Sequence, residues 1–402
     1  MLRDEIIRLS NELEQHTLEI RHAIHSKPEL SYKEFATSAL VCQELTAMGI
    51  PYVESSVKPG IIATIDSGKP GKFILLRADM DALPISEGTD LEFASKVPNV
   101  MHACGHDVHT ANLLTVGNIL NQTKSAWTGK VKLVFQPAEE NGGGGREMIK
   151  AGMMDEVPDA CFAMHVKVLE PGMCLIGSGP LSAYTDSYRI TIYGKASHSS
   201  TPEKGVDAIS IAAAVINGYN MMLAKNISPM AHSTLNYGTI NGGSAANILA
   251  DKVELTLMLR NATKEARDTM MAGIERITKG TAETMGGSCE IAFRKGYDSV
   301  YNDEKLAAFS ADVIEENKEL IFADIMPDGK PPVNYLRTGD QALLGGEDFG
   351  FYSQKAPSCM LWLGTGVYGV AHSTTFQVDD RAIKFCTRVM SLVAAEYLLE
   401  EK

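Results

Sequence analysis

Residues 101–109, with the sequence MHACGHDVH, concentrate side chains that bind transition metals. Cys104 and His106 are separated only by Gly105, whose conformational freedom permits a tight turn between them. Thiolate and imidazole groups suit zinc, cobalt and similar ions, so this spacing predicts a metal-binding loop. Two other interpretations stay open: a nucleophilic cysteine with a histidine base, or polar residues that cap the following helix. Metal binding is favoured because the chain offers further donors.

Those further donors are Glu140, His165 and His372, which we expect at strand ends or in neighbouring loops. A lone histidine is usually structural, but two cations a few ångströms apart need about this many donors. The sequence therefore predicts two divalent metal ions held by Cys104, His106, Glu140, His165 and His372.

The carboxylates Glu139 and Glu140 are adjacent in the motif QPAEE. Neighbouring side chains of an extended segment point in different directions, so we expect one to bind metal and the other to move protons. We assign Glu140 to the metal, and Glu139 to general base and then general acid. A solvated acidic loop is the alternative. Asp79 and Asp81, in RADMDALP, either bind the metals or orient a histidine ligand, and we favour the second role.

Four apolar runs, at residues 73–76, 131–135, 160–164 and 359–363, are each followed by these polar residues. In open, mostly parallel α/β sheets, ligands bind outside the carboxyl ends of the strands. The sequence therefore predicts that donors far apart in the chain meet at one edge of a sheet.

The chain has 402 residues, which favours two domains or one large domain with an insertion. Residues 186–295 follow a strand–helix–strand–strand–helix–strand pattern, which predicts an inserted ferredoxin-like βαββαβ domain. Residues 1–185 and 296–402 then form a catalytic α/β domain with a mixed, largely parallel sheet flanked by helices.

Three residues of the inserted segment are further candidates. His198, in GKASHSSTP, follows a predicted strand and is a candidate oxyanion stabiliser. Asn247 and Arg260 are candidates for binding a substrate carboxylate. A turn asparagine and a strand-end arginine are equally compatible with the sequence.

The net charge of −13 disfavours nucleic-acid binding. Seven scattered cysteines without a Cys-x-x-Cys pair are typical of a reducing compartment, so we expect a cytoplasmic protein. No apolar run approaches the length of a membrane span, and no membrane partner is expected.

The ordered motifs RHAIHSKPEL, RADMDALPI, MHACGHDVH, QPAEE, GKASHSSTP, GGEDF and AHS resemble those of one family. It is the aminoacylase-like metallopeptidases, in the amidohydrolase branch with hippurate hydrolases, N-acyl-L-amino-acid amidohydrolases, N-acetyldiaminopimelate deacetylases and hydrolases of auxin conjugates. The resemblance implies the same five metal ligands, Glu139 as general base, and zinc, manganese or cobalt as the metal. It also implies a homodimer or higher oligomer through the inserted domain, which acts as a lid, with His198 able to reach into a partner's site.

The sequence departs from the family pattern at residues 166–168, where Val-Lys-Val replaces an aromatic-proline stretch, and at serines 197, 199 and 200. The expected activity is hydrolysis of small N-acyl amino acids, such as acetyl or benzoyl derivatives, to a carboxylic acid and a free amino acid. A dinuclear dipeptidase and a catalytically idle binding relative are the alternatives.

Overall fold

The computed structural model describes residues 2–325, 335–336, 344–366 and 368–399. The chain forms two compact units. The first comprises Met1–Gly179, Tyr301–Asp340 and Phe351–Lys402, and the second comprises Pro180–Val300 and Gln341–Gly350. The second unit is somewhat wider than the predicted insertion at 186–295. Its roles as lid and dimerisation domain stay predictions.

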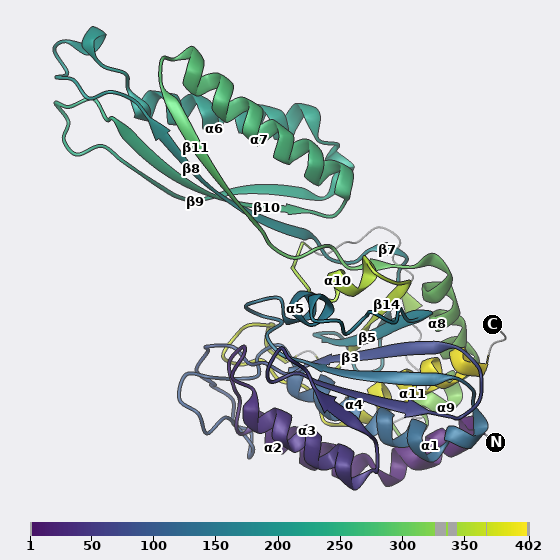
Figure 1. Cartoon of the computed structure of the whole chain (residues 1–402). Helices are drawn as coiled ribbons and strands as arrows, with labels where there is room; N and C mark the ends of the chain where they lie inside the picture. Colours follow the sequence, from purple (N-terminus) through teal and green to yellow (C-terminus); the bar gives the residue numbers. More distant parts are fainter. Residues whose placement is uncertain (1, 326–334, 337–343, 367, 400–402) are drawn as a thin grey trace. The chain divides into compact units, whose positions relative to one another are not determined.

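The first unit contains an eight-stranded sheet in the order β1-β2-β4-β3-β5-β14-β6-β13 (Figure 1). Its centre consists of four parallel strands, which coincide with the four predicted apolar runs: β4 (Lys130–Gln136), β3 (Phe73–Asp79), β5 (Ala160–Lys167) and β14 (Ser358–Gly364). Antiparallel pairs lie outside them and use β1 (Tyr52–Glu54), β2 (Ile61–Asp66) and β6 (Cys174–Leu175). The short β13 (Tyr335–Leu336) runs parallel to β6. The predicted mixed, largely parallel sheet is confirmed.

Helices pack against this sheet. Both α4 (His106–Gln122) and α11 (Arg381–Leu399) contact the central strands β3 and β5. Residues 2–25 form two helices, α1 (Leu2–Glu12) and α2 (Glu14–His25), which pack on α11 and α4. Next to β2 lies α3 (Phe35–Ala47). The described residues also form α5 (Gly144–Lys150), α8 (Glu304–Glu316), α9 (Lys318–Phe322) and α10 (Gly350–Ser353).

The second unit contains a four-stranded antiparallel sheet in the order β11-β8-β10-β9, with α6 and α7 side by side on one face (Figure 1). The elements are β8 (Tyr184–Tyr193), α6 (Ala208–Asn226), β9 (Ser233–Gly242), β10 (Lys252–Asn261), α7 (Lys264–Thr284) and β11 (Ser288–Lys295). Side chains from both layers, including Ile190, Tyr219 and Ile274, are buried in a separate core. This arrangement confirms the predicted ferredoxin-like fold.

Within the described ranges, no helix is both long and apolar enough to cross a membrane.

Candidate dinuclear metal site

The parallel strands β3, β4 and β5 end at one edge of the sheet, and α4 begins beside them at His106. Gly105 precedes this helix with φ 90°, and an added Cβ there would lie 2.2 Å from the side chain of Val166. Glycine is therefore required both by the backbone conformation and by the space available. The tight turn predicted between Cys104 and His106 is present, and it places both side chains at this edge.

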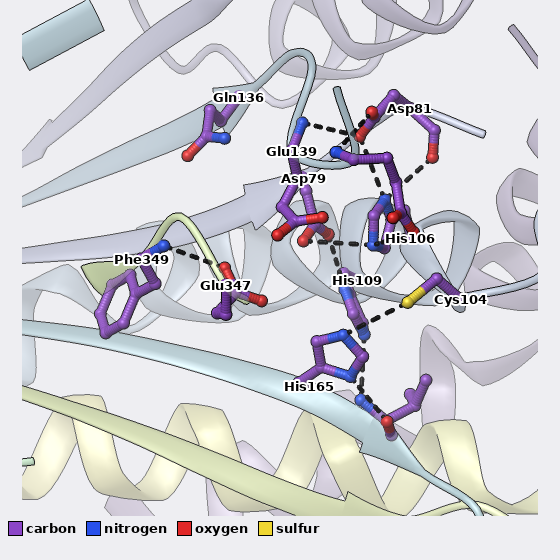
Figure 2. A network of polar contacts seen from close by, with 12 residues as sticks. Asp79, Asp81, Cys104, His106, His109, Gln136, Glu139, His165, Glu347 and Phe349 are labelled. Carbon is purple, nitrogen blue, oxygen red and sulfur yellow. Dashed lines mark hydrogen bonds and ion pairs between the residues drawn. The ribbon is translucent and has the colours of Figure 1, made fainter. Parts of the chain in front are cut away.

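Several groups of possible donor atoms meet there, and Cys104 belongs to two of them. The first contains Cys104, His106 and His165, and the second contains Cys104, Glu140 and His372. Within each group the candidate ligand atoms lie within 4.8 Å of one another. The structure thus brings together all five predicted metal ligands, which come from segments up to 268 residues apart (372 − 104). Figure 2 shows Cys104, His106 and His165 converging with the neighbouring carboxylates.

Two buried atoms in this cluster have the surroundings expected of metal ligands. His106 Nε2 and Glu140 Oε1 have no hydrogen-bond partner within the described part of the chain. Glu140 Oε1 nevertheless lies 3.3 Å from His372 Nε2 and 3.9 Å from His106 Nε2. Buried polar atoms are nearly always paired, so atoms that converge without bonding one another indicate a missing common partner. A divalent cation fits this donor set of sulfur, nitrogen and oxygen.

The outer ring nitrogens of two ligand histidines are fixed by oxygen acceptors. His106 Nδ1 lies 2.9 Å from the backbone oxygen and 3.2 Å from Oδ1 of Asp81. His165 Nδ1 lies 2.7 Å from the backbone oxygen of Val166, and its Nε2 is 3.6 Å from Cys104 Sγ. Such contacts set the tautomer so that Nε2 carries the lone pair toward a metal.

His109 belongs to the same motif but uses both ring nitrogens in protein contacts. Its Nδ1 lies 2.6 Å from Asp79 Oδ1, and its Nε2 accepts a hydrogen bond from the backbone N–H of Val166 at 3.0 Å. His109 is therefore a buried link between β3 and β5, and Asp79 orients it. Arg77 donates a hydrogen bond to Asp79 Oδ2 at 2.7 Å. Burial opposes the charge on Asp79, but Arg77 and the neighbouring histidines outweigh it and hold the pKa of this carboxyl well below its usual range.

The thiol of Cys104 is not activated by its protein surroundings. Burial, together with the Glu140 carboxylate, raises the pKa of Cys104 to about 12. A catalytic cysteine needs the opposite shift, so this environment disfavours the nucleophilic interpretation and suits a thiolate formed on metal binding.

The carboxylates of Glu139 and Glu140 do not diverge as expected. Residues 139–140 form a turn, and both carboxylates lie within 4.8 Å of His106 and of each other. The predicted divergence of the two carboxylates is therefore wrong, because it requires an extended segment. Only Glu140 also joins the group with Cys104 and His372, so the two carboxylates still differ in their surroundings.

Two buried carboxylates hold this turn by its backbone. Asp81 accepts hydrogen bonds from the backbone N–H groups of Glu139 and Glu140, each at 3.0 Å. Glu34 accepts one from the N–H of Ala138 at 2.8 Å, and Ala138 has φ 57°. No role was predicted for Glu34, since nothing in its local sequence distinguishes it from a surface glutamate at a helix start. Glu347 and Asp348 of the GGEDF motif are buried carboxylates that belong to the second unit, and they also had no predicted role.

Two of the three predicted candidates of the second unit, His198 and Asn247, lie near each other, and Arg260 is distant from both. His198 and Asn247 lie in adjacent loops, because the backbone N–H of Ser199 donates to the Asn247 oxygen at 3.0 Å. These loops flank the end of the sheet where Lys252 pairs with Tyr193. Arg260 is at the opposite end of β10, roughly 25 Å away, and donates to the backbone oxygen of Leu344 at 2.6 Å.

Comparison with known proteins shows the family of the chain. The sequence profile of peptidase family M20/M25/M40 matches residues 75–396. The chain belongs to this family. It is 35% identical to thermostable carboxypeptidase 1 of Saccharolobus solfataricus, over 98% of this chain and 99% of that protein. It is 38% identical to an N-acyl-L-amino acid amidohydrolase of Geobacillus stearothermophilus, over 75% of this chain and 82% of that protein.

A solved structure supports the fold and the metal count. The Bacillus subtilis YXEP protein, described as a dinuclear metal binding peptidase of the M20 family, matches with a TM-score of 0.82 and 29% identity. The match covers 96% of this chain and 99% of that one. Membership in the M20 family, together with the two donor groups, means that the chain is a hydrolase of amide bonds with two metal ions.

Proposed function

We propose that the chain is an amidohydrolase that cleaves small N-acyl amino acids to a carboxylic acid and a free amino acid, with zinc, manganese or cobalt as the metal. The observation that carries the proposal is the position of Glu139, a buried carboxylate beside His106 and Glu140 whose backbone is held by Asp81. Relatives described as an N-acetylcysteine deacetylase and an N-acyl-L-amino acid amidohydrolase support the choice of substrate class.

In this proposal Glu139 accepts a proton from the attacking water and then passes it to the departing amine. Two cations held by the five predicted ligands would supply polarisation of the amide carbonyl and a water molecule of lowered pKa. Asp81 fixes the backbone of Glu139 and the ring of His106 at once, so the proton acceptor and a ligand keep a constant relative position.

We further propose a cytoplasmic homodimer in which the second unit is the lid. The separation of Arg260 from His198 and Asn247 by most of the length of β10 supports this proposal, since one small substrate could not contact all three within a single second unit. In a dimer, His198 and Asn247 would act on the partner's substrate. Mixing inactive His198→Ala and Arg260→Ala proteins should then restore part of the activity, whereas sites complete within one chain would stay inactive after mixing.

The proposed reaction is tested by measuring release of free amino acid from N-acetyl and N-benzoyl amino acids. Chelator-stripped protein should be inactive and regain activity with one of the three metals. Glu139→Ala should abolish turnover with metal content near that of the unmodified chain. A loss of metal in this variant would mean that Glu139 and Glu140 have been assigned in reverse.

The carboxypeptidase relatives favour a second candidate, a dinuclear exopeptidase. It is distinguished by comparing an N-acetyl amino acid with the dipeptide that has glycine in place of the acetyl group. Preference for the dipeptide would indicate recognition of a free amine and would contradict the amidohydrolase proposal.

A further inference from the structure

A pocket of about 230 Å³ opens beside the metal ligands within the first unit. Cys104 and His165 form part of its wall, so a group bound there is adjacent to the reacting centre. The rest of the lining is mainly apolar and includes Val166, Val168, Trp362, Val370 and Phe376. The pocket is thus suited to a short hydrocarbon chain.

One charged side chain, Lys167, also lines this pocket. Lys167 is half-buried, and its Nζ lies 4.6 Å from the centre of the Trp362 ring. Among the residues that the structure describes, no carboxylate forms an ion pair with this ammonium group and no acceptor forms a hydrogen bond with it. Contact with the indole face partly stabilises the charge, but an ammonium group in an apolar wall is much better stabilised by an anion.

The sheet places this charge at a defined distance from the metal ligands. His165 and Lys167 are two residues apart on β5, so their side chains lie on one face of the strand, roughly 7 Å apart. Trp362 is the register partner of His165 on β14, and the two rings are 4.9 Å apart between centres. A chain of two or three methylene groups that starts at the scissile carbonyl would place its far end near Lys167.

The position of Glu139 indicates which part of the substrate enters the pocket. The departing amine must approach Glu139 to receive its proton, and the acyl chain extends from the other side of the carbonyl carbon. Glu139 is not part of the pocket wall, and no donor group of the described residues contains both Glu139 and His165. Figure 2 shows the two side chains well separated, with His109 between them. The acyl chain therefore points to His165 and into the pocket.

We propose that Lys167 makes this enzyme selective for acyl groups that end in a carboxylate, so that its substrates are dicarboxylic half-amides of amino acids, such as N-succinyl or N-glutaryl derivatives. The proposal rests on the amidohydrolase function proposed above. The apolar wall holds the methylene groups, and the Lys167 ammonium group pairs with the terminal carboxylate.

The test compares kcat/KM of the metal-loaded enzyme for N-acetyl, N-pentanoyl and N-succinyl derivatives of one amino acid. Pentanoyl and succinyl chains have similar lengths and differ in the terminal charge. We expect the unmodified enzyme to prefer succinyl over pentanoyl by about tenfold or more, the range of a charge-assisted hydrogen bond. Lys167→Met should abolish or invert this preference while activity on the acetyl substrate changes little.

Lys130→Met is the matched control. The Lys130 Nζ also lies over an aromatic ring, 4.5 Å from the centre of Phe73, but it pairs with Glu156 and does not line the pocket. This variant should keep the succinyl preference. If Lys167→Met hydrolyses the acetyl substrate and keeps the succinyl-to-pentanoyl ratio of kcat/KM of the unmodified enzyme, the proposed role of Lys167 is wrong. The amidohydrolase proposal would not be affected by that result. Failure of every N-acyl substrate with every metal would overturn the proposed function and this inference together.

Discussion

Glu34 binds the backbone next to the turn that carries Glu139 and Glu140, and its carboxyl group is fully buried. Its Oε1 accepts the N–H of Ala138, whereas Oε2 has no hydrogen-bond partner in the described part of the chain. Burial, with the nearby Asp81 carboxylate, raises the pKa of Glu34 to about 8. The native protein therefore holds Glu34 in its protonated form at neutral pH.

We expect Glu34→Gln to remove a pH-dependent loss of stability. Between pH 4.5, the ordinary pKa, and about 8, the native chain keeps a proton that the unfolded chain releases. The free energy of unfolding of the unmodified protein must then fall as pH rises through this window. A shift of about 3.5 units corresponds to at most about 5 kcal/mol, and relaxation around the buried charge reduces it to about 2–4 kcal/mol. Glutamine keeps the acceptor for Ala138 and does not titrate.

The assay is urea unfolding of both proteins at equal metal loading, at about pH 5, 7 and 9. The free energy of unfolding of Glu34→Gln, minus that of the unmodified chain, should increase by about 2–4 kcal/mol from pH 5 to pH 9. Glu156→Gln, at an exposed position of the same unit, is the control and should show no such trend. A constant difference between Glu34→Gln and the unmodified protein across this range would refute the argument that Glu34 is buried as the neutral acid.

Three other perturbations have expected outcomes of different kinds. Cys104→Ala should lower the bound metal below two ions per chain after dialysis, measured by mass spectrometry, while Cys289→Ala in the second unit should not. Asp107→Asn should destabilise the first unit by about 3–5 kcal/mol in denaturant unfolding, because this buried carboxylate pairs with two basic side chains of α2. Gly144→Ala should lower kcat about tenfold or more, since its Cβ would lie 1.8 Å from a backbone oxygen of the loop that leads to Glu139. Gly280→Ala, on a helix with open space around it, should leave kcat unchanged and stabilise the chain by about 0.5–1 kcal/mol.

Much of the fold was predictable because its signals are local. The central strands are buried on both faces, so they appear as continuous apolar runs, and residues 73–79 of β3 are buried throughout. The predicted meeting of Cys104, Glu140 and His372 followed from residue type and from the rule that parallel strands end at one edge. Histidine and cysteine are uncommon enough that such a set carries information even when its members are far apart in the chain.

The geometry of the turn that carries Glu139 and Glu140 could not be predicted in the same way. Its shape depends on Ala138 at positive φ, a conformation that alanine rarely adopts and that the surrounding structure must impose. The hydrogen bonds that hold it join the carboxylates of Glu34 and Asp81 to backbone N–H groups, and every residue except proline has such a group. A sequence therefore shows a carboxylate such as Asp81 or Glu34 but not which backbone it binds.

Asp81 illustrates the consequence. Its predicted role was to orient a histidine, and it does contact His106, but it also accepts hydrogen bonds from Glu139 and Glu140 and from the hydroxyl group of Ser31 at 2.7 Å. One buried carboxylate thus joins a candidate metal ligand to the candidate proton acceptor. Moving either group would cost hydrogen bonds at the other, because a buried carboxylate left without donors is strongly destabilised. Precise placement of the two groups relative to each other therefore comes from this shared partner rather than from the stiffness of the following segment, which has four consecutive glycines.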